Sequence, residues 1–409
     1  MVALAIELAD ELVDGAKGAA LPLIRHDLGL SYAQVGLLAS VPLLAGGALE
    51  LPLGILAGDG RRRRLAVLGG GVVFILSLLA VASARSFAVL LCAFTVFFPA
   101  SGAFVSLTQA ELMDAWPDRQ ATIMARWDLA GSAGAVAGPL LLTVVLAGGG
   151  SWRTAYLVLA ALASVAWVAS CLREHSPLAP LGPAGGGSAV GESAGGRDAS
   201  GEPGPSWTAR AREVLAALRD WSTVRWVLLL QVGDLLVDVL TGFLALYLVD
   251  VAHLRPELAA LAIAIRLGAG LAGDAALVVV LERVGDLTVL RATATAAAVL
   301  YPAFLLVPGV AAKLVILAVL SAATAPWYPL LQARLYGSLP GRSSVAVTLS
   351  SAAGLAGGLG PLAVGFAAER FGLPWALGAL VVVPVVVLVF GPGIFGPGVF
   401  GSGRRAAER

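Results

Sequence analysis

The sequence predicts an all-α integral membrane protein of about twelve transmembrane helices, and three observations support this prediction. Of the 409 residues, 58% are hydrophobic and only 13% are charged, whereas soluble domains carry about 25% charged residues. A soluble chain of this length could not bury so much apolar surface in one or two cores. The apolar runs have the length, about 20 residues, that a helix needs to cross a bilayer. The 50 glycines fit helices that pack closely in lipid.

Hydropathy divides the chain into twelve expected spans joined by short polar loops. The first span begins at the N-terminus and carries four acids before residue 15. A signal peptide would not tolerate these acids, so we interpret this segment as a true span. The expected spans are 2–24, 32–57, 65–84, 86–110, 121–147, 153–172, 224–249, 257–281, 287–307, 312–335, 344–368 and 373–391.

A long polar stretch separates the sixth span from the seventh. We expect an N-terminal six-helix bundle at 1–172, a cytoplasmic linker at 173–223, a C-terminal six-helix bundle at 224–392 and a cytoplasmic tail at 393–409. The first part of the linker is rich in Gly, Ser and Pro, which predicts disorder. Its second part, 207–221, mixes charged and apolar residues. This pattern predicts a short amphipathic helix that lies on the membrane surface, or a helical linker without lipid contact.

The distribution of positive charge predicts the orientation of the chain. Of the 27 lysines and arginines, 18 lie in or next to the loops after even-numbered spans and in the C-terminal tail, and 6 lie in or next to the opposite loops. Cytoplasmic loops carry the excess of Lys and Arg in multi-pass proteins. We therefore expect a multi-pass protein of the cell membrane with both termini in the cytoplasm.

The two halves of the chain resemble each other. Three acids of the first half recur 224 positions later in the second half. A glycine-rich segment that ends at Pro139 also resembles one that ends at Pro361. Such a duplication implies two parallel six-helix halves with a ligand site between them near the bilayer midplane. The acid pairs are Asp10 with Asp234, Asp14 with Asp238, and Glu50 with Asp274.

Leaving out the five residues at each end, the expected spans contain nine acids but only three bases. A charge at the centre of a span costs at least about 2.5–3.5 kcal/mol, so it usually faces a partner or a water-filled cavity. At 100° per residue, the charged side chains from Glu7 to Lys17 share one face of the first span. Pairing cannot neutralise the surplus acids, which must be protonated, hydrated or matched by a cation. We predict proton coupling or substrate binding by Asp10, Asp14, Lys17, Glu50, Asp234, Asp238, Arg266 and Asp274.

A structural explanation of these charges remains open. Lys17 lies three residues after Asp14, so the two could form an ion pair instead of binding a ligand. Arg126 and Asp128, near one end of the fifth span, fit structural pairing better than transport. In this alternative the charges hold helices together and do not take part in transport.

Two loops carry motifs that resemble those of the major facilitator superfamily. The loop after the second span reads GILAGDGRRRR from Gly54 to Arg64, and the loop after the eighth span contains an acid-Arg-x-Gly core. In the first loop the acid comes one place late and the usual Arg-x-Gly spacer is missing, so this loop is a shortened variant of the family signature. The resemblance implies the major facilitator fold over all twelve spans and a cytoplasmic latch in which acids pair with arginines. The expected latch residues are Asp59, Arg61, Arg62, Glu282 and Arg283.

The fifth span contains a Gly-x3-Gly-Pro pattern that resembles the antiporter signature of the same family. Its residues Gly134, Gly138 and Pro139, with Pro361 in the repeat, are expected to allow close helix packing and bending. Phe98 stands four residues before Gly102, where proton–drug antiporters of the family carry an arginine, so the chain departs from that pattern. A general likeness to bacterial exporters such as the fosmidomycin-resistance proteins does not fix a substrate.

Three functions remain open at this stage. The first is proton-coupled, alternating-access export of a small cationic or zwitterionic amphiphile. The second is a proton-coupled uptake symporter for a polar or anionic solute held by Arg126 or Arg266. The third is a membrane receptor that does not transport.

The expected partners are a small-molecule substrate, protons and membrane lipids, and the expected state is a monomer. We expect no enzyme activity, since His-Glu-x-x-His, paired intramembrane histidines and Gly-x-Ser-x-Gly do not occur. Isolated histidines and two distant cysteines give no expectation of a metal or a cofactor. The net charge of +1 gives no reason to expect that the protein binds nucleic acid.

Overall fold

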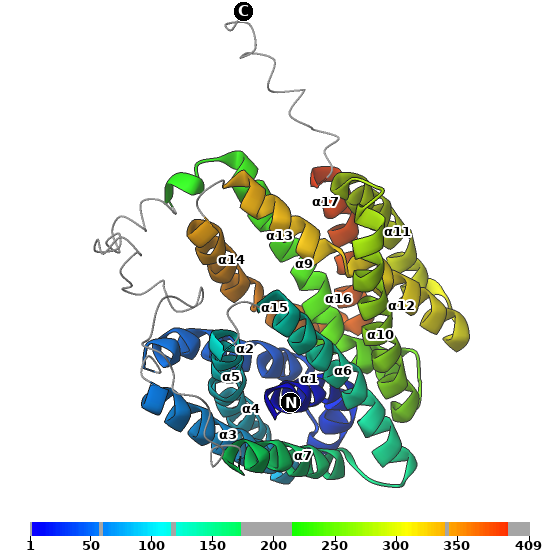
Figure 1. The fold of residues 1–409 in the computed structure, drawn as a ribbon. Coiled ribbons are helices and arrows are strands. Elements are labelled where there is room, and N and C mark those ends of the chain that lie inside the picture. The colour runs from blue at the N-terminus through cyan, green and yellow to red at the C-terminus, as the bar shows by residue number, and fades with distance from the viewer. Residues whose placement is uncertain (1, 57–59, 116–119, 173–214, 340–342, 392–409) are drawn as a thin grey trace, which may run out of the picture. The chain divides into compact units, whose positions relative to one another are not determined.

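A computed structural model shows helices joined by short turns throughout the part of the chain that it describes (Figure 1). The structure describes residues 2–56, 60–115, 120–172, 215–339 and 343–391. Within these ranges, eleven helical stretches are long and apolar enough to cross a membrane. Helix α1 (Val2–Leu28), with 27 residues, is also long enough to cross a membrane but carries five charged residues in its N-terminal two-thirds. The prediction of an all-α membrane protein with twelve spanning helices is confirmed.

The first six spans agree with the hydropathy prediction to within a few residues at most ends. After α1 come α2 (Tyr32–Leu56), α3 (Gly60–Ser83), α4 (Phe87–Ser101) with the π-helix η1 (Gly102–Ser106) and α5 (Leu107–Ala115), α6 (Gln120–Ala147) and α7 (Trp152–Leu172).

The last six spans agree equally well, although several consist of more than one helix. They are α9 (Trp221–Leu246) with the π-helix η4 (Tyr247–Val251), α10 (Pro256–Leu281), α11 (Asp286–Leu306), α12 (Val310–Thr324) with α13 (Trp327–Ser338), α14 (Ser343–Gly357) with α15 (Gly360–Phe371), and α16 (Leu373–Gly378) with the 3₁₀ turn η5 (Ala379–Val381) and α17 (Val382–Phe390).

Proline and glycine explain most of these interruptions. Pro99 lies three residues before η1, and Pro326 separates α12 from α13 because it has no backbone N–H to donate. The break between α14 and α15 falls in a glycine-rich segment that ends at Pro361. Hydropathy predicted each of these spans as continuous, since it reports apolar length and not the hydrogen-bond register.

The chain forms two compact units that do not follow chain order strictly. Unit 1 contains the chain up to Ser206 together with Thr241–Ala264 and Pro361–Glu369. Unit 2 contains Trp207–Leu240, Ile265–Gly360 and the chain from Arg370. Unit 1 therefore holds α1–α7 and pieces of α9, α10 and α15. The expected division at residues 173–223, most of which lie outside the described ranges, stays a prediction.

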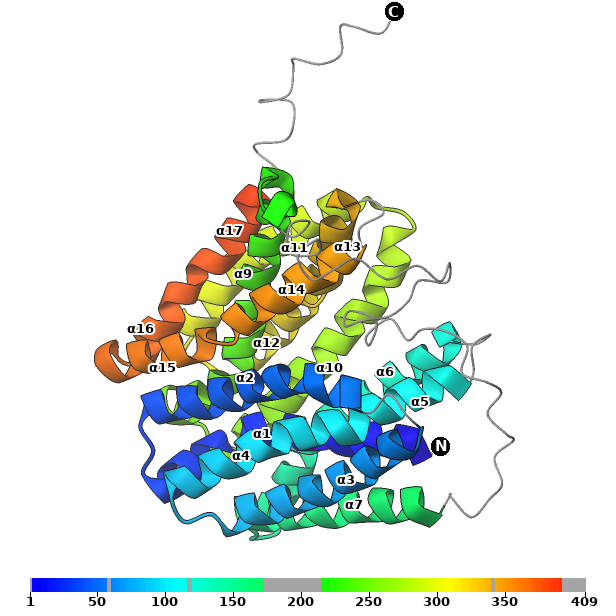
Figure 2. The same ribbon diagram turned by 90° about the vertical axis from the view of Figure 1, so that its left-hand side faces the viewer.

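Within unit 1, helix α1 occupies the centre of the N-terminal helices, which run side by side in two perpendicular views (Figures 1 and 2). Its closest neighbour is α6, and glycine makes this approach possible. A Cβ atom on Gly15 would lie 2.2 Å from the carbonyl oxygen of Ala135, and one on Gly138 would lie 2.3 Å from that of Leu12. Any larger side chain at these positions would push the two helices apart.

Pro139 explains why the Ala135 oxygen is available for this contact. Proline has no N–H, so the Ala135 carbonyl four residues earlier loses its helical donor. A Cβ atom on Gly15 would be directed at this oxygen. Because glycine has a hydrogen in place of the Cβ, an α-hydrogen of Gly15 faces the oxygen instead. Such Cα–H···O contacts are common where membrane helices pack closely.

Within unit 2, α11 packs against α12 and α17. The hydroxyl of the fully buried Tyr301 donates a hydrogen bond of 2.8 Å to the carbonyl oxygen of Leu377. The indole of Trp327 donates one of 3.2 Å to Thr293 Oγ1. These bonds satisfy polar groups of buried aromatic residues, as a low-dielectric environment requires.

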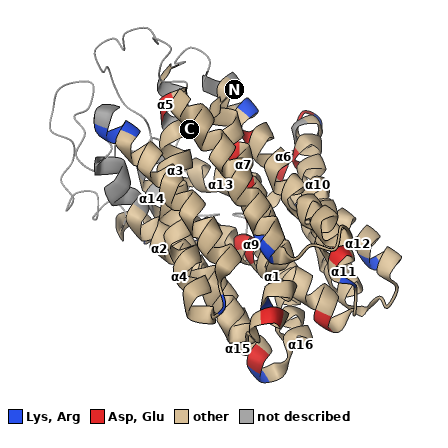
Figure 3. Cartoon of the chain, turned by 90° about the horizontal axis from the view of Figure 1, so that it is seen from below, with Lys and Arg blue, Asp and Glu red and all other residues tan. Residues whose placement is uncertain are grey.

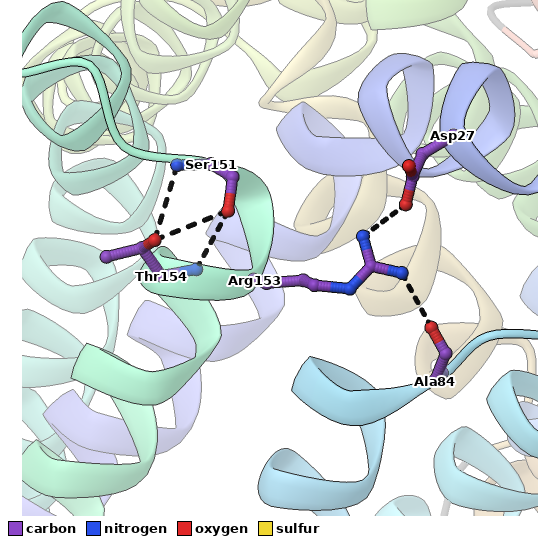
Figure 4. Close-up of polar contacts among 5 residues, drawn as sticks. All are labelled: Asp27, Ala84, Ser151, Arg153 and Thr154. Carbon is purple, nitrogen blue, oxygen red and sulfur yellow. Dashed lines mark hydrogen bonds and ion pairs between the residues drawn. The ribbon is translucent and has the colours of Figure 1, made fainter.

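Arg153 at the start of α7 connects three elements of unit 1 (Figure 4). Its guanidinium forms an ion pair with Asp27 at the end of α1 and donates a 2.7 Å hydrogen bond to the carbonyl oxygen of Ala84 after α3. Ser151 and Thr154 cap the same helix end by bonding to each other's backbone N–H groups at 3.3 and 3.4 Å. Both charged side chains are partly exposed, so this contact is a structural clamp and not a buried charge pair.

We expect Arg153→Gln to lower the thermal unfolding midpoint of the purified protein by a few degrees. The lost hydrogen bonds to a charged group are worth about 1.5–3 kcal/mol before the discount for solvent screening. Arg85→Gln is the matched control, because Arg85 is an exposed arginine beside Ala84. Equal midpoints for the two variants in a detergent unfolding assay would contradict the role of the clamp.

Candidate functional site

Few charged residues lie along the helices away from their ends (Figure 3). In unit 1 most of these charges belong to α1 and form what we call the α1 cluster. The residues of this cluster share one face of the helix, as their spacing predicted. The α1 cluster consists of Glu7, Asp10, Glu11, Asp14 and Lys17.

Two acids of the α1 cluster face α6. Glu7 is only 8% exposed, and its Oε1 lies 2.6 Å from the position that a Cβ of Gly131 would occupy. The Cβ of Glu11 lies 3.0 Å from the corresponding position of Gly134. The small residues of α6 therefore make room for carboxyl groups as well as for the backbone of α1. The packing position expected of Gly134 is seen here, whereas its contribution to transport stays a prediction.

The other residues of the α1 cluster face α4 or open space. Ser101, the last residue of α4, donates a hydrogen bond of 2.8 Å to Asp10 Oδ1. Lys17 Nζ lies 4.4 Å from the ring centroid of Phe98 and 5.6 Å from that of Phe94. The Asp14 carboxylate is 3.8 Å from this ammonium, and its side chain is 51% exposed. The ion pair that the sequence left open is thus present but loose.

Unit 2 contains a second group of charges, which we call the α9 cluster: Asp234, Asp238 and Arg266. Asp234 and Asp238 lie one helical turn apart on α9, as predicted. Arg266 on α10 is 8% exposed and donates a 3.2 Å hydrogen bond to the carbonyl oxygen of Val237.

The remaining charged residues singled out in the sequence belong to α2, α6 and the later part of α10. Asp274 is exposed on α10, beside Gly273, where a Cβ would lie 2.4 Å from the carbonyl oxygen of Ala322 on α12. Glu50 belongs to α2, but its side chain lies outside the described part of the structure. Arg126 and Asp128 are both exposed on α6. A role of Glu50 or Asp274 in coupling stays a prediction.

The predicted latch is described only in part. Asp59 lies outside the described ranges, and nothing is described of the Arg61 side chain. Arg62 is exposed at the start of α3, and Glu282 and Arg283 are exposed in the turn after α10. Their participation in a latch stays a prediction.

An ion pair that the sequence did not indicate lies beside this second turn. Asp286, the first residue of α11, pairs with Arg334 on α13. Asp286 Oδ1 also accepts a hydrogen bond of 2.8 Å from the backbone N–H of Leu287. The position of Asp286 directly after the acid-Arg-x-Gly core is the signal that could have identified it.

A group of residues at the turn between α1 and α2, which we call the Arg25 lock, also went unnoticed in the sequence. Arg25 Nη1 donates a hydrogen bond of 2.8 Å to Asp250 Oδ2, and the Tyr32 hydroxyl donates one of 2.9 Å to the same oxygen. The guanidinium carbon of Arg25 lies 4.1 Å from the centroid of the Tyr32 ring. The backbone N–H of Tyr32 donates a 2.9 Å bond to Glu369 Oε2.

Small residues bring helices together beside the Arg25 lock. A Cβ on Gly36 of α2 would lie 2.9 Å from the carbonyl oxygen of Pro361, and one on Gly365 would lie 2.6 Å from that of Tyr32. The fully buried Ser40 accepts a 3.1 Å hydrogen bond from the backbone N–H of Leu362. Within unit 1, therefore, α2 packs closely along the start of α15.

This fold and these intramembrane charges define a polytopic transport protein. A family model described as Major Facilitator Superfamily matches residues 11–340. The chain therefore belongs to the major facilitator superfamily, a family of secondary transporters and not of enzymes. No curated protein sequence matches the chain.

Solved structures agree with the fold. A bacterial homologue of the human lysosomal transporter Spinster, in an inward-facing and occupied conformation, superposes with a TM-score of 0.71 at 16% identity. That comparison covers 95% of this chain and 94% of the other. The nucleoside transporter NupG superposes with a TM-score of 0.70 at 13% identity, covering 95% of this chain and 98% of the other. At these identities the likeness shows the shared fold alone.

Proposed function

We propose that this protein is a proton-coupled, alternating-access exporter of a small cationic or zwitterionic amphiphile. The observation that carries the proposal is the Asp14 carboxylate, half exposed midway along a membrane-spanning helix. A carboxylate exposed to hydrocarbon would cost several kcal/mol, so this group requires water or a cation beside it. The α1 cluster holds four acids and one lysine, which gives it a surplus of negative charge that favours protons and cations.

Uptake by proton symport is the second candidate function. Arg266 supports it, because a buried guanidinium on a spanning helix can hold an anionic group of a polar solute. In that case the α9 cluster would bind the solute and the α1 cluster would carry the proton.

The orientation proposed from the distribution of arginines places both termini in the cytoplasm of the cell. The Arg25 lock would then close the outer end of the transport path, and the exposed charges after α10 would lie at the cytoplasmic end. We propose that the protein works as a monomer, in keeping with an architecture in which one chain supplies both halves.

Transport into liposomes under an imposed pH gradient tests both candidates. Amphiphiles and polar solutes that raise the unfolding temperature of the purified protein are tested as radiolabelled substrates. We expect accumulation in vesicles that are acidic inside, since an antiporter exchanges internal protons for external substrate. Accumulation in vesicles that are acidic outside would instead favour the symporter.

A protonophore and protein-free vesicles are the controls for this assay. Dissipating the gradient should stop accumulation in either direction. Substrate flux that equilibrates without following the pH gradient would contradict proton coupling, and the absence of any flux would contradict transport of the solutes tested.

A further inference from the structure

Lys17 occupies a position built for a cation. Its ammonium lies 4.4 Å from the centroid of the Phe98 ring and 5.6 Å from that of Phe94, both on α4. The face of an aromatic ring carries negative electrostatic potential and attracts cations within about 6 Å of its centroid. The Lys17 side chain is 14% exposed, and the Asp14 carboxylate 3.8 Å away supplies the opposite charge. Two aromatic rings and one acid thus surround a positive charge.

The rings are fixed in place by their own surroundings. Phe94 is fully buried and stacks edge-on against Tyr156, with 6.3 Å between the ring centroids. Gly46 on α2 leaves room for Phe98, since a Cβ there would lie 3.1 Å from Phe98 Cβ. The Lys17 stem, by contrast, has four flexible carbons that let its ammonium leave this position while the rings remain.

The partnership between Lys17 and Asp14 is incomplete. A distance of 3.8 Å is longer than the 2.7–2.9 Å typical of a charge-assisted hydrogen bond. Half of the Asp14 side chain remains exposed, although the residues directly before and after Asp14 on α1 are buried. The acid therefore offers an accessible face to a second cation.

We propose that Lys17 is a tethered stand-in for the cationic group of the substrate, and that an organic cation binds Asp14 and Phe98 by displacing its ammonium. This proposal rests on the proposed function and specifies its substrate class: a weakly hydrated organic monocation, such as a quaternary or aryl cation. Such a cation loses little hydration when it contacts an aromatic face and so competes well with a strongly hydrated ammonium. The tethered ammonium would partly neutralise Asp14 when no substrate is bound.

Binding of tetraphenylphosphonium to the purified full-length protein tests this inference. Equilibrium dialysis against protein-free micelles corrects for partitioning into detergent, and no pH gradient is present. Lys17→Met keeps the length and apolar stem of the side chain but removes the competing charge, so we expect binding about tenfold tighter than wild type. Lys17→Arg keeps the charge and should bind near the wild-type level. Asp14→Asn and Phe98→Leu should each weaken binding several-fold.

Lys313→Met is the matched control. Lys313 is also buried on a membrane-spanning helix, with its ammonium 5.2 Å from the ring centroid of Phe304, but it donates hydrogen bonds to backbone carbonyls at 2.6 and 3.2 Å. Its replacement should leave tetraphenylphosphonium affinity unchanged. Lys17→Gln provides a second neutral variant if the methionine variant does not fold.

The stand-in proposal is contradicted if the neutral Lys17 variants bind the probe no more tightly than wild type. It is also contradicted if Lys17→Arg binds as tightly as Lys17→Met, or if neither wild type nor variants bind the probe. Because binding is measured without a gradient, these outcomes are independent of proton coupling. A protein that transports against a pH gradient but shows unchanged affinity in Lys17→Met would keep the proposed function and lose this inference. Tighter binding in Lys17→Met without gradient-driven transport would support this inference and contradict the proposed function.

Discussion

Replacing Asp14 or Asp238 by asparagine should abolish substrate accumulation driven by a pH gradient while sparing gradient-independent exchange of substrate. A carboxylate that carries a proton changes charge during the transport cycle, whereas an amide of nearly the same shape cannot. Asp14 is half exposed on α1 and Asp238 is partly exposed on α9, so both can be reached by protons from water. The measurement is accumulation of a radiolabelled substrate in liposomes, with counterflow under equal pH and at saturating substrate as the exchange assay.

Asp27→Asn is the matched control for this prediction. Asp27 lies at the end of the same helix but pairs with Arg153, so its loss should lower thermal stability and leave the pH dependence of transport unchanged. Asp10→Asn and Asp234→Asn extend the test to the other two acids of the repeat. Normal coupling in all four asparagine variants would mean that the acids only hold helices together, and the site assignment would be wrong.

The fold could be predicted almost completely, because apolar length is the property that a bilayer selects. The ends of most predicted spans agree with the helices of the structure to within a few residues. What could not be predicted is the change of hydrogen-bond register inside spans. Neither the π-helix η1 after Pro99 nor η4 alters the local hydropathy, since the same apolar residues occupy the helix in either register.

For each contact of the candidate site, the sequence predicted the charged residue but not its partner on another helix. The polar face of α1 follows from helical spacing, and the loose pair of Asp14 with Lys17 follows from their separation of three residues. The partners on α4, Ser101 and Phe98, come from tertiary packing that no local pattern reports. The pair of Arg25 with Asp250 joins residues 225 positions apart. In a hydropathy analysis, Arg25 and Asp250 look like any other charged residues at the ends of helices.

Breaking the Arg25 lock should release the contact between α2 and the start of α15. A hydrogen bond to a charged group contributes about 1.5–3 kcal/mol, which corresponds to at least a tenfold change in an equilibrium between closed and open states. Arg25 and Asp250 have side chains that are only 28% and 24% exposed, so screening by solvent is limited. We expect Asp250→Asn to shift the protein toward a state that is open beside the lock.

A cysteine at Ser40 provides the measurement. Ser40 is fully buried and bonds to the backbone of Leu362, so Ser40→Cys should react slowly with a water-soluble maleimide when the lock is closed. Both native cysteines, of which Cys92 is exposed, are replaced by alanine first. In this background Asp250→Asn should raise the labelling rate about tenfold. Tyr32→Phe removes only a hydroxyl hydrogen bond and should raise the rate less.

The charge swap Arg25→Asp with Asp250→Arg distinguishes a lock from general destabilisation. If attraction between the two groups keeps the state closed, the swapped pair should restore slow labelling that either single substitution loses. Arg255→Gln serves as the control, since Arg255 is an exposed arginine a few residues after Asp250. A labelling rate that stays at the wild-type level in both Arg25→Gln and Asp250→Asn would show that glycine packing alone holds α2 against α15, and that the ion pair has no part in closing this end.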